Sequence, residues 1–101
     1  MYKLSINKEK AIAKFRANFK RLYKELEDEL NINRKILSEM AGLARPTITK
    51  MLNSDSPELS WFTLYCVAKV IGTSMESIIE GNYDINKIKS HLIDTAKITK
   101  K

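Results

Sequence analysis

Apolar residues recur every three or four positions along the first third of the chain, which is the spacing of one face of an α-helix. They are Ile12, Phe15, Phe19, Leu22, Tyr23, Leu26 and Leu30. This stripe predicts a helix over about 8–30, with Asn7 as its N-cap. Asn31 can adopt the left-handed conformation that ends a helix.

Shorter stripes with the same spacing predict five further helices. Asparagine or serine precedes three of them, and glycine follows three. The predicted helices lie at about 34–41 and 45–53, between Ser60 and Gly72, between Ser74 and Gly81, and at about 85–96. The polar run 53–57 is predicted to be a loop, and residues 98–101 a frayed tail.

No stretch alternates between apolar and polar residues for long enough to predict a strand, so the predicted class is all-α. No repeat or linker divides the chain. We therefore expect one domain over 1–81 and a C-terminal helical appendage over 82–101. The apolar stripe of the appendage, which includes Ile88 and Leu92, has two interpretations. It folds back on the core, or it pairs with a second copy of the chain.

The charge balance favours an anionic partner. The chain has 101 residues, with 18 Lys and Arg against 12 Asp and Glu, a net charge of +6 and an isoelectric point near 9.5. Seven basic residues and one acidic residue lie between Lys8 and Lys24. Four basic residues and one acidic residue lie between Arg34 and Asn53. A surface charged only for solubility is the alternative explanation.

The composition argues against several classes of function. With 44% hydrophobic and 30% charged residues, and no apolar run near the roughly 18 residues of a membrane helix, we expect a soluble protein. Cys66 and His91 each occur once, so no disulfide, zinc finger or catalytic Cys–His pair is predicted. Cys66 is interpreted as a small hydrophobic residue and His91 as a surface residue. We expect a cytoplasmic protein that is not an enzyme and has no metal or cofactor.

The two short helices at 34–41 and 45–53 have the layout of a helix-turn-helix motif. Three residues separate them, and Gly42 stands where the turn requires a positive φ. Ser38 is small where the two helices approach each other. The outer face of the second helix suits the major groove of DNA, although a plain corner of two helices with a polar outer face is the alternative. Pro46, Thr49, Lys50 and Asn53 form this face, with Arg45 and Thr47 on its flanks.

The segment RKILSEMAGLARPTITKMLN at 34–53 resembles the helix-turn-helix of the lambda-repressor-like (XRE) regulators, whose usual pattern is QxxLAxxxGVSxxTIxxxExG. Leu37, Gly42, Thr47 and Ile48 match specified letters of this pattern, and Ala41 directly precedes the matching glycine. The resemblance covers roughly 15–81, because the later helices also fit the family. The positions that fit there are Leu64, Val67–Ala68, Ile71–Gly72, Ser74 and Ile78–Ile79.

The resemblance implies a role in DNA binding for eight residues. Those at positions where the family contacts base edges are Arg45, Pro46, Thr49 and Lys50. The family contacts phosphate at the positions of Arg34, Thr47 and Asn53, and Lys35 is added because it lies beside them. Base contacts give sequence specificity, whereas phosphate contacts give affinity and register.

Four departures from the family pattern leave room for a changed partner. Glu27 and Leu52 replace an arginine–glutamate pair that is frequent in the family, which suggests an apolar replacement of this pair. Ala44 replaces the usual serine cap, and Ser54 stands where glycine is usual. The acidic run 27–29 would repel phosphate if it faced the groove.

The sequence therefore predicts a five-helix lambda-repressor-like domain with an extra C-terminal helix, which binds double-stranded DNA as a small repressor that occludes its operator. We expect a homodimer that associates through the helices at 75–80 and 85–96. Trp61, Phe62 and Tyr65 are interpreted as packing in the core or an interface, not as a stacking platform for single strands. The alternative function is an antitoxin-like or inhibitor protein that uses the same scaffold to bind another protein.

Overall fold

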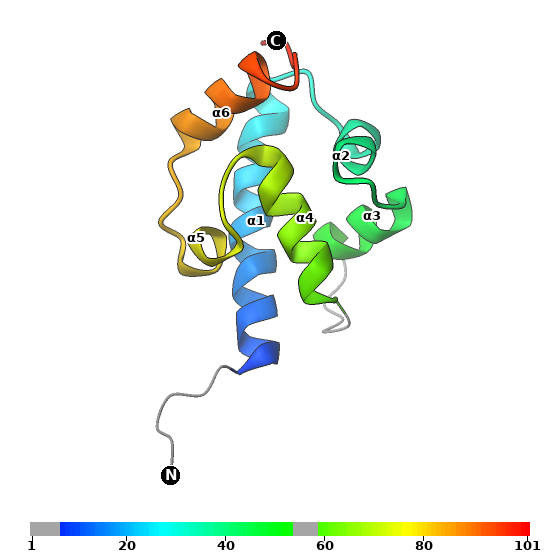
Figure 1. Ribbon diagram of the computed structural model, residues 1–101, viewed down its shortest axis with the longest axis vertical. Helices are drawn as coiled ribbons and strands as arrows, with labels where there is room; N and C mark the ends of the chain where they lie inside the picture. The colour runs from blue at the N-terminus through cyan, green and yellow to red at the C-terminus, as the bar shows by residue number, and fades with distance from the viewer. Residues whose placement is uncertain (1–6, 54–58) are drawn as a thin grey trace.

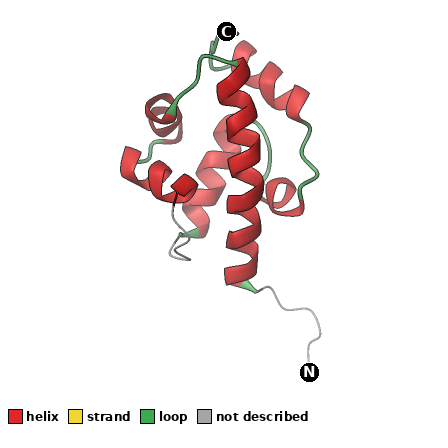
Figure 2. Cartoon of the chain, turned by 180° about the vertical axis from the view of Figure 1, so that it is seen from behind, coloured by secondary structure: helices red, strands yellow, loops and turns green. Residues whose placement is uncertain are grey.

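The computed structural model describes residues 7–53 and 59–101, and all of its regular elements in these ranges are helices (Figures 1 and 2). The elements are α1 (Lys8–Glu29), α2 (Arg34–Ala41), α3 (Arg45–Asn53), α4 (Trp61–Ile71), α5 (Met75–Glu80) and α6 (Ile85–Asp94). The predicted all-α class is confirmed. The predicted loop, including Ser54, lies outside the described residues apart from Asn53, which ends α3.

Local polar residues set where most of these helices begin. The side chains of Asn7, Asn33, Ser60 and Ser74 each accept a hydrogen bond from the backbone N–H three residues further on, as predicted. Asp84 caps α6 in the same way, accepting from the N–H groups of Asn86 and Lys87. Two of the predicted helix ends differ slightly. Helix α1 ends at Glu29 and α6 at Asp94, each before the predicted end.

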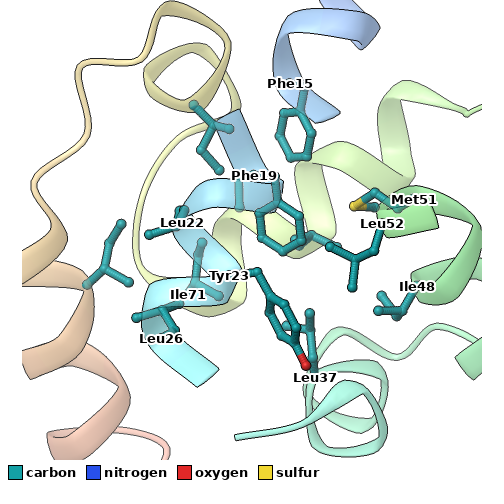
Figure 3. Packing of buried hydrophobic residues seen from close by; sticks show 14 of the residues in the cluster. Phe15, Phe19, Leu22, Tyr23, Leu26, Leu37, Ile48, Met51, Leu52 and Ile71 are labelled. Carbon is teal, nitrogen blue, oxygen red and sulfur yellow. The ribbon is translucent and has the colours of Figure 1, made fainter. Parts of the chain in front are cut away.

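Helix α1 runs along the length of the molecule, and the other helices pack around it (Figures 1 and 2). Its seven predicted apolar residues are all buried. In Figure 3, Phe19 and Tyr23 point from α1 toward side chains of α2 and α3. The side chains labelled on α2 and α3 are Leu37, Ile48, Met51 and Leu52. Burial of a large apolar side chain stabilises a fold by roughly 1.5–3 kcal/mol, so this cluster holds α2 and α3 on the body of the protein.

The C-terminal helix folds back on the core. Ile88 and Leu92 are 1% and 0% exposed, so the apolar stripe of α6 is already covered within one chain. Lys89 of the same helix pairs with two residues of α1, with Glu25 at 3.1 Å and with Glu29. Hydrogen bonding to Glu29 and, secondarily, to Glu25 raises the pKa of Lys89 above its ordinary value.

His91 is not the surface residue that was predicted. It is half-buried, and its Nε2 lies 3.1 Å from the carbonyl oxygen of Val70 in the last turn of α4. Carbonyl groups in the last turn of a helix have no partner within the helix, so the ring of His91 satisfies one of them. This contact joins α6 to the end of α4.

The predicted frayed tail is also wrong. Ile98 is only 8% exposed, and Lys100 forms an antiparallel bridge with Leu30. The backbone N–H of Asn31 donates to the carbonyl of Thr99 at 2.8 Å, and the Asn31 side chain donates to the Thr99 hydroxyl at 2.7 Å. The tail is ordered because the connection between α1 and α2 offers backbone groups that no helix satisfies.

Two of the three aromatic residues near the start of α4 lie outside the core. Trp61 packs half-buried against the core, but Phe62 and Tyr65 are exposed. Packing in the core is therefore wrong for these two residues, and packing in an interface stays a prediction. Cys66 is half-buried in the same helix.

We expect Gly72→Ala to lower the free energy of unfolding by about 2–4 kcal/mol. Gly72 has a φ of +88°, which disfavours alanine, and an added Cβ would lie 2.5 Å from Cγ of His91. Gly42→Ala is the matched control, because Gly42 has a φ of +68° with no atom within 4 Å of an added Cβ. Urea unfolding should show a smaller loss for Gly42→Ala, of about 1–2 kcal/mol, which is the cost of a left-handed backbone for a residue with a side chain. Equal losses would contradict the proposed clash with His91.

Candidate nucleic-acid interface

Helices α2 and α3 form a helix-turn-helix whose turn is built by backbone hydrogen bonds. Gly42 adopts a left-handed conformation, and its N–H donates to the carbonyl of Glu39 at 3.3 Å. The N–H of Leu43 donates to the carbonyl of Ser38 at 3.0 Å. Ser38 is buried, and its hydroxyl donates to the carbonyl of Lys35 at 2.7 Å, so its only polar side-chain group is satisfied. The turn therefore has the geometry that its sequence predicts.

Helix α3 has a buried inner face and a polar outer face. Ile48 and Met51 are completely buried, and Leu52 is 5% exposed, so these three side chains hold the helix to the core. The buried Leu52 agrees with the apolar replacement expected at this position. On the outside, four of the predicted site residues are exposed and two are half-buried. The exposed residues are Arg45, Pro46, Lys50 and Asn53, and the half-buried ones are Thr47 and Thr49.

The start of α2 lies close to the end of α3. The Arg34 guanidinium donates a hydrogen bond from Nη2 to the side-chain oxygen of Asn53 at 3.3 Å. Two of the predicted phosphate-contacting residues, far apart in the sequence, are thus brought together. Lys35 is exposed beside Arg34, at the N-terminus of α2. The positive end of the helix dipole and the unpaired N–H groups of the first turn also favour an anion at this position.

Helix α3 is a ridge between two hollows. The hollow on the α2 side has a volume of about 580 Å³ and is lined by Glu27, Asn33, Arg34, Lys35, Arg45 and Thr49. The hollow on the α4 side has a volume of about 350 Å³ and is lined by Pro46, Thr47, Lys50, Leu59, Ser60 and Thr63. Seven of the eight predicted site residues, all except Asn53, are therefore distributed over both flanks of one helix, not gathered in one cleft. Such a protruding helix has a shape that the major groove, about 12 Å wide, accepts.

Glu27 brings a negative charge to the hollow on the α2 side. The repulsion of phosphate that was expected of the acidic run 27–29 applies to this residue, since it lines the same hollow as Arg34 and Arg45. Burial, followed by the charge of the nearby Glu27 carboxylate, raises the pKa of Tyr23 far above its ordinary value. The Tyr23 hydroxyl therefore stays protonated, and Glu27 is the negative group at this edge of the site.

Sequence reasoning missed some features of the surface. Arg16 is one of the seven basic residues between Lys8 and Lys24 on which the charge argument depends, but it is only 7% exposed. Helical spacing does carry this signal, because Arg16 lies four residues after Ile12 and three before Phe19, on the apolar stripe. Ser60 and Thr63 were not assigned to the site, but they line the hollow beside Lys50.

The described residues contain no group of three or more His, Cys, Asp or Glu side chains placed to hold a metal ion. Among them, too, no helix is long and apolar enough to cross a membrane. The chemistry at the surface of α3 is that of hydrogen bonding and positive charge. These interactions recognise DNA through base edges and phosphates.

Comparison with known proteins supports the same assignment. A family model described as a Cro/C1-type helix-turn-helix DNA-binding domain matches residues 21–84, which include all of α2 to α5. No curated protein and no solved structure gives a significant match to the chain. The family match spans more than half of the chain and contains the whole motif described above. The chain therefore belongs to the family of Cro/C1-type helix-turn-helix DNA-binding domains.

Proposed function

We propose that this DNA-binding protein is a sequence-specific repressor that inserts α3 into the major groove of its operator. The observation that carries the proposal is the division of α3 into a buried inner face and a polar outer ridge. The predicted base-reading residues, Arg45, Pro46, Thr49 and Lys50, all belong to that helix. Family membership supports DNA as the partner.

Each residue of the ridge has a contact that suits its chemistry. Arg45 or Lys50 donates hydrogen bonds to guanine O6 and N7. The Thr49 hydroxyl accepts or donates a hydrogen bond at a base edge, and the Pro46 ring packs against a thymine methyl group. Arg34, Lys35, Thr47 and Asn53 contact phosphates on the two flanks of α3. The hydrogen bond between Arg34 and Asn53 supports this division, because it holds the guanidinium at the end of the α2 dipole that attracts an anion.

Repression by occlusion requires only that the protein stay bound over a promoter. A domain that carries the helix-turn-helix is sufficient for this, without catalysis. We propose a cytoplasmic homodimer, because one module makes a small interface with DNA and a two-fold operator doubles the number of contacts. The half-sites would then lie about one helical turn apart, roughly 34 Å.

Methylation interference tests the placement of α3. A duplex enriched by binding to the protein is treated with dimethyl sulfate, which blocks guanine N7 in the major groove. We expect methylated guanines within each half-site to abolish binding, and a minor-groove ligand to leave it unchanged. Binding that tolerates methylation but is displaced by the minor-groove ligand would contradict the proposal.

The presence of Glu27 in the hollow favours one second candidate function. A carboxylate beside Arg34 and Arg45 suits a protein surface with both signs of charge better than it suits phosphate. In this alternative the α2–α3 face binds another protein, as an antitoxin-like or inhibitor subunit does. Weak and salt-sensitive retention of duplex DNA, with no preferred sequence, would favour this alternative.

A further inference from the structure

The tail at 98–101 is held by its backbone against the end of α1. The N–H of Lys101 donates to the carbonyl of Glu29 at 3.0 Å, and the side-chain nitrogen of Asn31 donates to the carbonyl of Lys100 at 3.3 Å. Two opposite views place the tail beside the end of α1, where the connection to α2 begins (Figures 1 and 2). The tail therefore has a fixed position next to this connection.

The end of α6 directs the chain to this position. Lys97 has a φ of +59°, which is the left-handed conformation that often follows a helix. After it, the N–H of Ile98 donates to the carbonyl of Leu92 at 3.0 Å, and the side chain of Ile98 is buried. Residues with a side chain seldom adopt a positive φ, so the buried Ile98 and its hydrogen bond are what hold the tail in this direction.

The tail carries two lysines whose charges no neighbour neutralises. Lys100 and Lys101 are exposed, and within the described ranges neither side chain forms an ion pair or a hydrogen bond. Lys89 differs from them, since it binds both Glu25 and Glu29. Because the backbone that carries Lys100 and Lys101 is already fixed, these lysines lose less conformational entropy when they bind an anion.

The connection that holds the tail also leads to the hollow on the α2 side of α3. Asn31 binds the tail, and Asn33 lines that hollow together with Arg34. Lys100 lies opposite Leu30 in an antiparallel bridge, in which Cα atoms are about 4.5–5.5 Å apart. The four residues from Leu30 to Arg34 add at most about 14 Å, so the Cα atoms of Lys100 and Arg34 lie within about 20 Å of each other. Phosphates recur about every 3.4 Å along one strand, so this distance covers about six of them.

The tail also opposes the negative charge at the end of α1. This end carries Glu27, Asp28 and Glu29, has no basic residue in its last turn and is the negative end of the helix dipole. Lys89 binds Glu29, whereas Glu27 and Asp28 form no ion pair with any described residue. The two lysines of the tail therefore offset the repulsion of phosphate at this edge of the protein.

We propose that the tail is a second phosphate-binding element, in which Lys100 and Lys101 contact the DNA backbone on the α2 side, beyond the bases that α3 reads. The inference rests on the proposed function, because it requires α2 and α3 to lie on the duplex. It goes beyond that function, because the matched family model ends at residue 84, before α6 and the tail. Contacts with phosphate add affinity and register without sequence preference.

Removal of both charges tests the proposal through the salt dependence of DNA binding. Lys100→Gln with Lys101→Gln should reduce the slope of log affinity against log salt by about 1.8 for each bound chain, because two phosphate contacts are lost. If such contacts add nothing at about 1 M salt, this slope corresponds to about 30-fold weaker binding at about 150 mM. Fluorescence anisotropy of a labelled duplex with one half-site measures both quantities. The variant should fold normally, because the tail is held through backbone groups, and its thermal unfolding should match the wild type.

Two control variants separate contact with phosphate from total charge. Lys69→Gln with Lys87→Gln removes the same charge from exposed positions on α4 and α6 that line neither hollow beside α3. This variant should keep the wild-type slope, and so should Lys100→Arg with Lys101→Arg, which retains both charges. An equal effect of the Lys69 and Lys87 substitutions would overturn the proposal.

The length of the duplex locates the contact. Shortening the duplex on the α2 side, down to the bases that α3 contacts, removes the phosphates that the tail binds. We expect this to weaken binding by the wild type as much as the loss of both lysines does, and to leave the Lys100→Gln, Lys101→Gln variant unaffected. Equal losses for the two proteins would overturn the proposal.

The outcomes separate this inference from the proposed function. A wild type without sequence preference, whose salt slope falls when both lysines of the tail are replaced, supports the contact of the tail and contradicts the repressor. A wild type that selects a sequence, but whose slope is unchanged by the same replacement, overturns the contact of the tail and supports the repressor.

Discussion

We expect Ile48→Ala to lower the free energy of unfolding by about 2–5 kcal/mol. Ile48 is completely buried and lies on the inner face of α3, where it faces the side chains of α1 and α2 (Figure 3). Its truncation removes apolar contacts and leaves a cavity under the helix that carries the base-reading residues. Urea unfolding measures the loss, which is a large part of the stability of a domain of this size.

Ile48→Val is the matched control, with an expected loss of about 0.5–1.5 kcal/mol. Both variants should select the same DNA sequence as the wild type when the measurement is made where they are folded. The reason is that Ile48 faces the core and not the outer ridge. A changed sequence preference in a folded Ile48 variant would show that the two faces of α3 are not independent.

Arg45→Ala relaxes base specificity at one position of each half-site. A bidentate contact with guanine is worth about 1–3 kcal/mol of discrimination, and 1.4 kcal/mol corresponds to a factor of ten in affinity. Titration of duplexes that differ at one base pair should therefore show a preference for guanine in the wild type and little preference in the variant. The side chain of Arg45 is exposed, so we expect the stability of the variant to be unchanged.

Arg34→Ala is the comparison that separates specificity from affinity. It should weaken binding to all duplexes by the same factor and reduce the slope of log affinity against log salt by about 0.9, because one phosphate contact is lost. The variant also loses the hydrogen bond to Asn53, so we expect the loss of affinity to be slightly larger than that of one phosphate contact alone. Equal losses on preferred and random duplexes for both Arg45→Ala and Arg34→Ala would contradict the assigned roles.

Features that depend on neighbours along the chain could be predicted from the sequence. The apolar stripe of α1 and the four caps at Asn7, Asn33, Ser60 and Ser74 are set by residues within one or two turns. The contacts of the tail could not be predicted in this way. Asn31 and Thr99 are 68 residues apart, and nothing local shows that their backbones meet.

In the candidate site, too, the sequence predicts what depends on local spacing and not what depends on contacts between helices. Helical spacing predicts that Arg45, Pro46, Thr49 and Lys50 lie outside a stripe containing Ile48, and the structure places them there. The contact between Arg34 and Asn53 depends on how α2 and α3 cross, which no local pattern determines. The exposure of Phe62 and Tyr65 could not be predicted from the sequence for another reason. Apolar and aromatic residues occur around most of α4, so the pattern does not distinguish its inner and outer faces.

Selection from a pool of random duplexes, at about 150 mM salt, tests the central claim most directly. The full chain is incubated with the pool, and the bound fraction is recovered and sequenced over several rounds. We predict enrichment of a pseudo-palindrome whose half-sites lie about one helical turn apart and contain a guanine that Arg45→Ala no longer selects. Weak retention without an enriched sequence would contradict the claim that α3 reads bases.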